Sequence, residues 1–466
     1  MSTLERVGNG RRAPDPGRWG ITIVSDLHLS VGCNPGDNTG AHILHDAGFA
    51  RFLGHVRRRA AEQRSGWRLV ILGDLVDLPD AEAPPADTIT VLTQVAAGHP
   101  GLFRAVGELL AAGLQVDVVA GNHDVALLRR AVRERFADLV LAAAGDWSVM
   151  AGIRFHPWIY HLPGVLYAEH GSQYHDINAM PALLGLDGSD DHRPAGPPLA
   201  AELARYRRRL RERRAEQSWP AALLGGGHES LRFAAALARR AHALSGPELA
   251  RQRAAYRVST LRQYVAEVGI AHDALVGIDE LSVASGWSIA GRLLRTWVLG
   301  PVAQAGSGLR LLDRRHGPLW QPADRAAYLR SAWPAIHRLL RTAGQPVPFY
   351  VFGHTHHPEE LAMPDGSARY LNAGTWVPAG LPEGRPAPAS AGTFVEITGG
   401  PGVAAPVARL LRWNDEASQP EALTGHGTAT GPRRRHSSTV SPAGRRRRSG
   451  GGDRGHGGAR RSAPTR

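Results

Sequence analysis

Ile21-Thr22-Ile23-Val24-Ser25-Asp26-Leu27-His28 is an apolar, largely β-branched run that ends in an acid and a histidine. A short run of this composition predicts a buried strand, and its polar ending predicts a tight turn directly after that strand. Alternate residues of such a turn can face the same way. Asp26 and His28 are therefore candidate ligands of one metal ion.

Four later segments repeat this pattern. Apolar runs that predict strands occupy residues 68–72, 116–120, 165–169 and 349–352, and each is followed by a polar, mostly glycine-containing motif. Helical patterns cover residues 47–64, 102–112 and 125–136. This alternation predicts an α/β fold built in layers. Because ligands of open α/β sheets gather beyond the carboxyl ends of the strands, the five motifs are expected to meet at one site.

The motif residues are of types that bind transition metals. Asp74 follows the second strand, and its two oxygens can bridge cations about 3.5–4 Å apart. Asn122 follows the third strand and offers a carbonyl oxygen, His170 follows the fourth, and His354 and His356 follow the fifth. Imidazole mixed with carboxylate and amide oxygen suits manganese (Mn²⁺), Fe or Zn²⁺ better than Mg²⁺.

The ordered series Asp-x-His, Gly-Asp-x-x-Asp, Gly-Asn-His-Asp, His-Gly and Gly-His-x-His spans residues 26–356 and resembles the calcineurin-like metallophosphoesterase superfamily. The resemblance implies a layered β-sandwich flanked by helices. It also implies two divalent metal ions and hydrolysis of a phosphodiester or pyrophosphate bond by a metal-activated hydroxide. One ion would be held by Asp26, His28, Asp74 and His356, and the other by Asp74, Asn122, His170 and His354. His123 would stand unligated near the leaving group, oriented by Asp124, and would protonate or stabilise the leaving oxygen.

Two segments allow two interpretations each. Asp77, the last residue of Gly73-Asp74-Leu75-Val76-Asp77, is either a hydrogen-bond partner of a metal ligand or a residue that starts a helix. Asn372-Ala373-Gly374-Thr375 either lines the site, as the late loop of the superfamily does, or is a plain turn. The other histidines of this region, His156, His161, His175 and His357, are assigned to the surface or the core.

Within the superfamily, the motifs around Asp26, His170 and His354 most resemble the bacterial UDP-2,3-diacylglucosamine pyrophosphatase-like branch, which implies a lipid-linked or nucleotide-sugar substrate. The sequence departs from that branch at His123, where arginine is typical, and in the length of its helical insertion. Three alternatives stay open. A DNA or RNA nuclease of the same superfamily shares the Gly-Asn-His-Asp motif, a scaffold would have lost its ligands, and a phosphoprotein phosphatase would carry an arginine motif that is not evident here.

The domain organisation follows from shifts in composition. A flexible segment is expected at 1–19 and a metallophosphoesterase domain at 20–412. Long Ala/Leu/Arg-rich stretches at 178–345 predict a helical insertion that caps the sheet. Residues 413–466 are rich in Gly, Ser, Pro and Arg, and are expected to be a disordered tail.

Charge and cysteine content indicate partners and location. The segment 426–466 holds 11 arginines and one acid, Asp453, so it carries +10 of the formal net charge of +13. A basic tail suits contact with anionic polymers or with a membrane surface, or it is a non-functional extension. Cys33 is the only cysteine, and the polar N-terminal residues do not resemble a signal peptide. A cytoplasmic location, peripheral to the inner face of the membrane, is expected, with no obligate protein partner.

The insertion also invites a membrane interpretation. Residues 205–214 form a dense basic helix candidate, and residues 285–299 combine Trp287 and Trp297 with other apolar residues and two arginines. Such a composition could lie in a lipid interface or line an acyl groove. It could equally form the core of the insertion itself, since a stable helical region needs an apolar face.

Overall fold

Two mixed β-sheets form the centre of this computed structural model. It describes residues 18–31, 43–63, 66–79, 83–145, 152–175, 178–180, 235, 260–282, 326–377, 391–400 and 405–423. All of them fall in one unit, Met1–Thr428. The α/β class expected from the sequence is confirmed.

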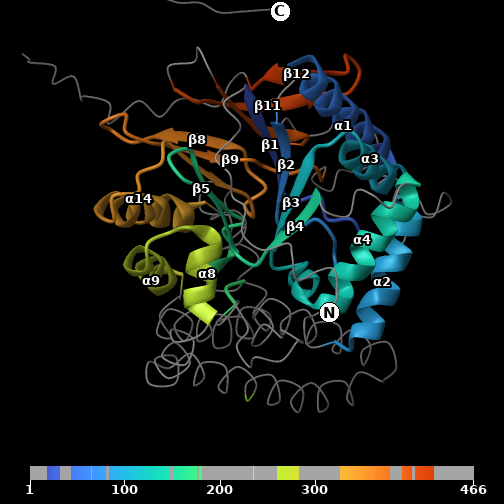
Figure 1. The fold of residues 1–466 in the computed structure, drawn as a ribbon, viewed down its shortest axis with the longest axis horizontal. Helices are drawn as coiled ribbons and strands as arrows, with labels where there is room; N and C mark the ends of the chain where they lie inside the picture. Colours follow the sequence, from blue (N-terminus) through green and yellow to red (C-terminus); the bar gives the residue numbers. More distant parts are fainter. Residues whose placement is uncertain are drawn as a thin grey trace, which may run out of the picture. The chain divides into compact units, whose positions relative to one another are not determined.

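The first sheet has seven strands in the order β12-β11-β10-β1-β2-β3-β4 (Figure 1). Strands β1 to β4 are mutually parallel, and β10, β11 and β12 extend the sheet with antiparallel pairs. Their bounds are β1 Trp19–Val24, β2 Gly66–Leu72, β3 Gln115–Val119, β4 Ile153–His156, β10 Thr393–Gly399, β11 Val407–Asn414 and β12 Gln419–Ala422.

The second sheet has five strands in the order β5-β6-β7-β9-β8. Its centre, β6, β7 and β9, is parallel, and both edge strands are antiparallel to their neighbours. The bounds are β5 Ile159–Leu162, β6 Leu166–Glu169, β7 Phe349–Phe352, β8 Glu359–Ala362 and β9 Arg369–Asn372.

Alternation along the strands produces three layers of core. In β1, Ile21 and Ile23 lie in the cluster between the two sheets, whereas Val24 faces the helices that cover the first sheet. In β7, Val351 lies between the sheets and Phe352 faces the helices of the second sheet. Successive side chains of a strand point to opposite faces, so each central strand contributes to two layers.

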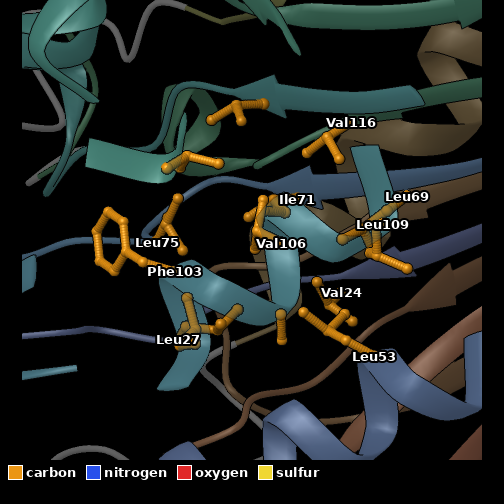
Figure 2. Packing of buried hydrophobic residues seen from close by; sticks show 14 of the residues in the cluster. Val24, Leu27, Leu53, Leu69, Ile71, Leu75, Phe103, Val106, Leu109 and Val116 are labelled. Atoms are coloured by element: carbon orange, nitrogen blue, oxygen red, sulfur yellow. The ribbon is translucent and has the colours of Figure 1, made fainter. Parts of the chain in front are cut away.

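Helices cover the outer face of each sheet. The first sheet packs against α1 Ile43–Gln63, α2 Pro85–Gly98, α3 Pro100–Ala111 and α4 Arg130–Ala144. Figure 2 shows this core, where Phe103, Val106 and Leu109 of α3 face Leu69 and Ile71 of β2. The second sheet packs against α8 Thr260–Val268, α9 His272–Leu281 and α14 Ala327–Thr342. Two short 3₁₀ helices, η2 Val125–Leu128 and η4 Ser172–Tyr174, follow motif residues.

The expected boundaries need correction at both ends of the domain. Trp19 is the first residue of β1 and belongs to the fold, not to a flexible segment. The tail was expected from residue 413, but β11 continues to Asn414 and β12 follows at Gln419–Ala422. Strand β12 was not expected because its four residues, Gln-Pro-Glu-Ala, have low strand propensity and are ordered by pairing with β11.

The described part of the helical insertion is a layer of the core. Trp333 of α14 packs near Tyr350 and Tyr370, with ring centroids 6.0 and 5.9 Å apart. Helices α8 and α9 share the same cluster. Residues 327–342 therefore complete the layer over the second sheet. Residues 205–214 and 285–299 of the insertion lie outside the described residues, as do 1–17 and 424–466.

Candidate metal centre

The five motifs meet where neighbouring parallel strands end. Strands β1, β2 and β3 lie side by side in the first sheet, and β6 and β7 lie side by side in the second. A hydrogen bond joins the two sheets at this edge: the His354 backbone N–H, at the end of β7, donates to Asp26 Oδ2, at the end of β1, at 2.9 Å. Within the second sheet, the Gly353 N–H donates to the His170 carbonyl at 3.0 Å. The convergence expected from the sequence is thus present in the structure.

The first candidate ligand group consists of Asp26, His28 and His356. His356 Nε2 lies 3.1 Å from Asp26 Oδ1 and 3.1 Å from His28 Nε2. Asp26 is fully buried, whereas the His356 side chain is partly exposed. A carboxylate oxygen and two imidazole nitrogens therefore face one small volume that solvent can reach.

The second candidate group consists of Asp74, His170 and His354. His170 Nε2 lies 3.2 Å from Asp74 Oδ2 and 3.2 Å from the Asn122 carboxamide oxygen. The other ring nitrogen of His170, Nδ1, donates to the Leu72 carbonyl at 2.9 Å. With Nδ1 engaged in that hydrogen bond, Nε2 is the ring nitrogen that a metal ion can take from its proton, which is the arrangement of a metal-binding imidazole.

Asp74 stands between the two groups. Its Oδ2 lies 3.2 Å from His170 Nε2 in the second group and 3.6 Å from His28 Nε2 in the first. Its Oδ1 accepts the His123 backbone N–H at 2.9 Å, which fixes the carboxylate plane. One carboxylate is thus placed to serve both groups.

The backbone of these motifs is held in an unusual conformation. Among the described residues, six that are not glycine have positive φ, and five of them are Asp26, His28, Asp74, His354 and His356. Asp and His tolerate the left-handed region better than most residues, but each such residue costs free energy. The strained backbone at these five residues indicates that the direction of the ligand side chains is maintained at a cost in conformational free energy of the backbone.

Buried charged groups at this edge shift one another's pKa values. Burial raises the pKa of Asp74, but the charge of His170 and its hydrogen bond outweigh this and leave the pKa below the usual range. Burial lowers the pKa of His28, yet the neighbouring carboxylates of Asp26 and Asp77 raise it to about 11. Burial also lowers the pKa of His170, and the charges of Asp74 and Asp26 raise it to about 9. Ionised carboxylates therefore dominate, and they attract either protons or metal cations.

The donor set fits divalent cations. Asp26 Oδ1 is buried and accepts no hydrogen bond, although His356 Nε2 is close to it. Buried carboxylate oxygens are rarely left without a partner, and an ion is one of the partners that satisfy them. The adjacent pair of imidazole nitrogens, His28 Nε2 and His356 Nε2, is explained by the same ion.

His123 has a different partner from the one expected. Its Nδ1 lies 3.1 Å from Asp77 Oδ1, and its side chain is 50% exposed. Asp124 does not orient it, because the Asp124 carboxylate is fully buried and accepts the backbone N–H groups of Leu75 and Gly121, both at 2.7 Å. Asp124 therefore ties the second motif to the third, and Asp77 takes the orienting role.

Asp77 also contacts a candidate ligand. Its Oδ1 lies 2.8 Å from His28 Nδ1, so one carboxylate oxygen orients both His28 and His123. Of the two interpretations of Asp77, the structure favours the hydrogen-bond partner.

The segment Asn372-Ala373-Gly374-Thr375 forms hydrogen bonds with the backbone of two ligand-bearing turns. Thr375 Oγ1 donates to the Asp26 carbonyl at 2.9 Å, and Asn372 Nδ2 donates to the Gly353 carbonyl at 2.8 Å. All of Asn372 and nearly all of Thr375 are buried. Their contacts go to the backbone of two ligand-bearing turns, so they support the site without reaching into it.

Three residues beside His354 were not predicted from the sequence. His175 Nδ1 and Asn178 Nδ2 each lie 3.1 Å from His354 Nε2, and the Tyr328 ring centroid lies 6.1 Å from that of His354. His175 lies five residues after His170, and nothing in that spacing distinguishes it from a surface histidine. Tyr328 comes from α14, far from every motif in the sequence.

No protein-family model matches the chain, and no curated protein matches it. Two solved structures among those similar to it are a 5'-nucleotidase from Candida albicans SC5314 and a phosphopantetheinyl hydrolase from Mycobacterium tuberculosis. The first has 9% identity and a TM-score of 0.30, covering 87% of this chain but only 54% of the nucleotidase. The second has 13% identity and a TM-score of 0.22, covering 78% of this chain and 91% of the hydrolase. At such TM-scores neither similarity carries an argument about fold or function.

Proposed function

We propose that this protein is a metal-dependent phosphoester hydrolase of the calcineurin-like type, with two divalent cations held by the candidate ligands. The observation that supports it most is the position of Asp74 Oδ2 between the two ligand groups, 3.2 Å from His170 Nε2 and 3.6 Å from His28 Nε2. A shared carboxylate is what a pair of cations about 3.5–4 Å apart requires. Asp26, His28, Asp74 and His356 would hold one ion, and Asp74, Asn122, His170 and His354 the other.

The residues of the chain divide the chemical work. Cations held by the candidate ligands would supply Lewis acidity and would lower the pKa of a bound water. We assign to His123 the transfer of a proton to the leaving oxygen, and its half-exposed ring, with Nδ1 held by Asp77, supports this role. With Nδ1 held in this way, Nε2 is left to face the substrate.

The substrate class that we propose is a phosphodiester or a pyrophosphate, on a lipid-linked or nucleotide-sugar molecule. The mixed nitrogen and oxygen donors favour manganese, iron or zinc over magnesium. A nuclease is the alternative within the same chemistry. A panel of aryl diesters, sugar-nucleotide lipids, cyclic nucleotides and DNA, assayed after metal analysis of the purified protein, separates these substrates.

Asp74→Asn is the variant that tests the proposal. It removes the anionic charge shared by both groups, so we expect loss of hydrolysis and weaker occupancy of both ions, measured by metal analysis after dialysis. Asp87→Asn is the matched control, because Asp87 is an exposed residue in the first turn of α2 and makes the same chemical change away from the site. Near-normal turnover in Asp74→Asn would overturn the two-metal assignment.

A further inference from the structure

His354 is in contact with a polar group outside the ligand set. Its Nε2 lies 3.1 Å from His175 Nδ1 and 3.1 Å from Asn178 Nδ2. His175 Nδ1 and Asn178 Nδ2 are themselves 2.9 Å apart. Three polar atoms thus meet on the side of the His354 ring where Nε2 points.

His175 is held in place by aromatic stacking. Its ring lies parallel to that of Tyr328, with centroids 4.9 Å apart and an interplanar angle of 7°. Tyr328 is in the first turn of α14, and its ring also lies edge-on to His354 at 6.1 Å. The next residue of the helix, Leu329, is fully buried in the core of the second sheet. The position of His175 is therefore determined by a helix anchored in that core.

The two ring nitrogens of a metal-binding histidine have separate tasks. One binds the ion, and the other almost always donates its N–H to an acceptor that fixes the ring and its tautomer. His170 follows this rule through the Leu72 carbonyl. For His354 the acceptor has to be found among the atoms around Nε2.

We propose that His175 is a positioning residue for the second metal ion: its Nδ1 accepts the N–H of His354 Nε2, which leaves His354 Nδ1 to bind the ion. This inference rests on the proposed two-metal function. His175 has the required lone pair in the tautomer that carries its proton on Nε2. Asn178 can serve one of the two rings at a time: its N–H can donate to His175 Nδ1 or, with the carboxamide turned over, its oxygen can accept the N–H of His354 Nε2. Through Tyr328 and His175, helix α14 thereby fixes the ring orientation of His354, which lies in the turn after β7.

The test separates the acceptor from the stack. His175→Phe keeps an aromatic ring on Tyr328 but removes the acceptor, whereas His175→Asn keeps a short acceptor and removes the ring. Both variants and the unaltered chain are titrated with Co²⁺, and the absorption spectrum, the number of ions bound and the melting temperature are recorded. We expect His175→Phe to bind the second ion roughly 10- to 100-fold more weakly, with the first ion unaffected, and His175→Asn to recover most of that loss.

A second pair of variants tests whether His175 acts through His354. In a His354→Ala background, adding His175→Phe should change Co²⁺ affinity no further. Wild-type Co²⁺ affinity in His175→Phe, or an equal loss in His175→Asn, would overturn the proposal while the proposed function stands. If the unaltered chain binds no divalent ion and hydrolyses no phosphoester, the proposed function itself fails.

Discussion

At the scale of single residues, the metal centre depends on close approach of the turns that carry the ligands. Gly121 lies directly against Asp74: a Cβ at position 121 would overlap the Asp74 carboxylate and its backbone nitrogen. Asp74 cannot move away easily, because its Oδ1 is fixed by the His123 N–H. Glycine is therefore needed at position 121 because of its close contact with Asp74, and not because of a positive φ angle.

Gly121→Ala should weaken binding of both metal ions and lower activity, because it displaces the carboxylate that the two ligand groups share. Metal analysis and turnover on a small diester measure the effect. Gly101→Ala is the control, since a Cβ there meets nothing within 4 Å. If Gly121→Ala retained both ions at normal affinity, the position of Asp74 would matter less than its charge.

His123→Ala should keep both metal ions and lower the turnover rate by roughly two to four orders of magnitude, as expected for a lost general acid. Asp77→Ala should differ, because Asp77 contacts both His123 and His28. We expect Asp77→Ala to lower the turnover rate and also to lower the affinity for the first ion about 10- to 100-fold. Loss of metal in His123→Ala would show that His123 is itself a ligand.

The seven candidate ligands could be predicted because each follows a strand in a local pattern, and parallel strands bring such endings together. The hydrogen-bond and stacking partners of these ligands could not be predicted from the sequence. Asp124 is adjacent to His123 in sequence, yet its buried carboxylate serves two backbone N–H groups, and Asp77, 46 positions earlier, orients the ring. The stack of His175 on Tyr328 joins residues with no local signal of proximity.

At the scale of elements, the main strands were predictable and the layer to which α14 belongs was not. Strands β1, β2, β3, β6 and β7 lie within one or two residues of their expected positions, because buried parallel strands are continuous apolar runs. Helix α2 and the short strands β4, β5, β8 and β12 were not predicted. Strand β8, for example, is Glu-Glu-Leu-Ala, and only pairing with β9 makes it a strand.

Trp333→Ala should lower the free energy of unfolding by about 3–5 kcal/mol, because Trp333 is buried against Tyr350 and Tyr370 in the core of the second sheet. Chemical denaturation measures it. Arg338→Ala, at an exposed position of the same helix, is the control and should change stability by less than about 0.5 kcal/mol. A small effect of Trp333→Ala would show that α14 contributes little to the core of the second sheet.

At the scale of the whole molecule, the ordered fold continues past the expected start of the tail. Asp415 forms an ion pair with Arg51 of α1, and the ring centroids of Trp413 and Phe52, also of α1, are 5.7 Å apart. Within the described residues, no helix combines the length and the apolar composition that a membrane crossing requires.

A chain ending at Trp413 should be less stable than the full chain by roughly 1–3 kcal/mol, since it lacks β12 and the Asp415 ion pair. A chain ending at Thr428 keeps both and should match the full chain within about 0.5 kcal/mol. Thermal melting of the three proteins makes the comparison. Equal stability of the two truncated chains would show that β12 contributes nothing.

The central place of β1 in the first sheet has a consequence for synthesis on the ribosome. One neighbour of β1 is β2, which emerges soon after it, but the other is β10, which begins at Thr393. The last candidate ligand, His356, is likewise made only after 355 of the 466 residues. Contacts between such distant segments form slowly, because a long loop must close first. A nascent chain therefore carries β1 with one edge open until β10 has been made, and it acquires its complete set of candidate ligands only after His356 has been added.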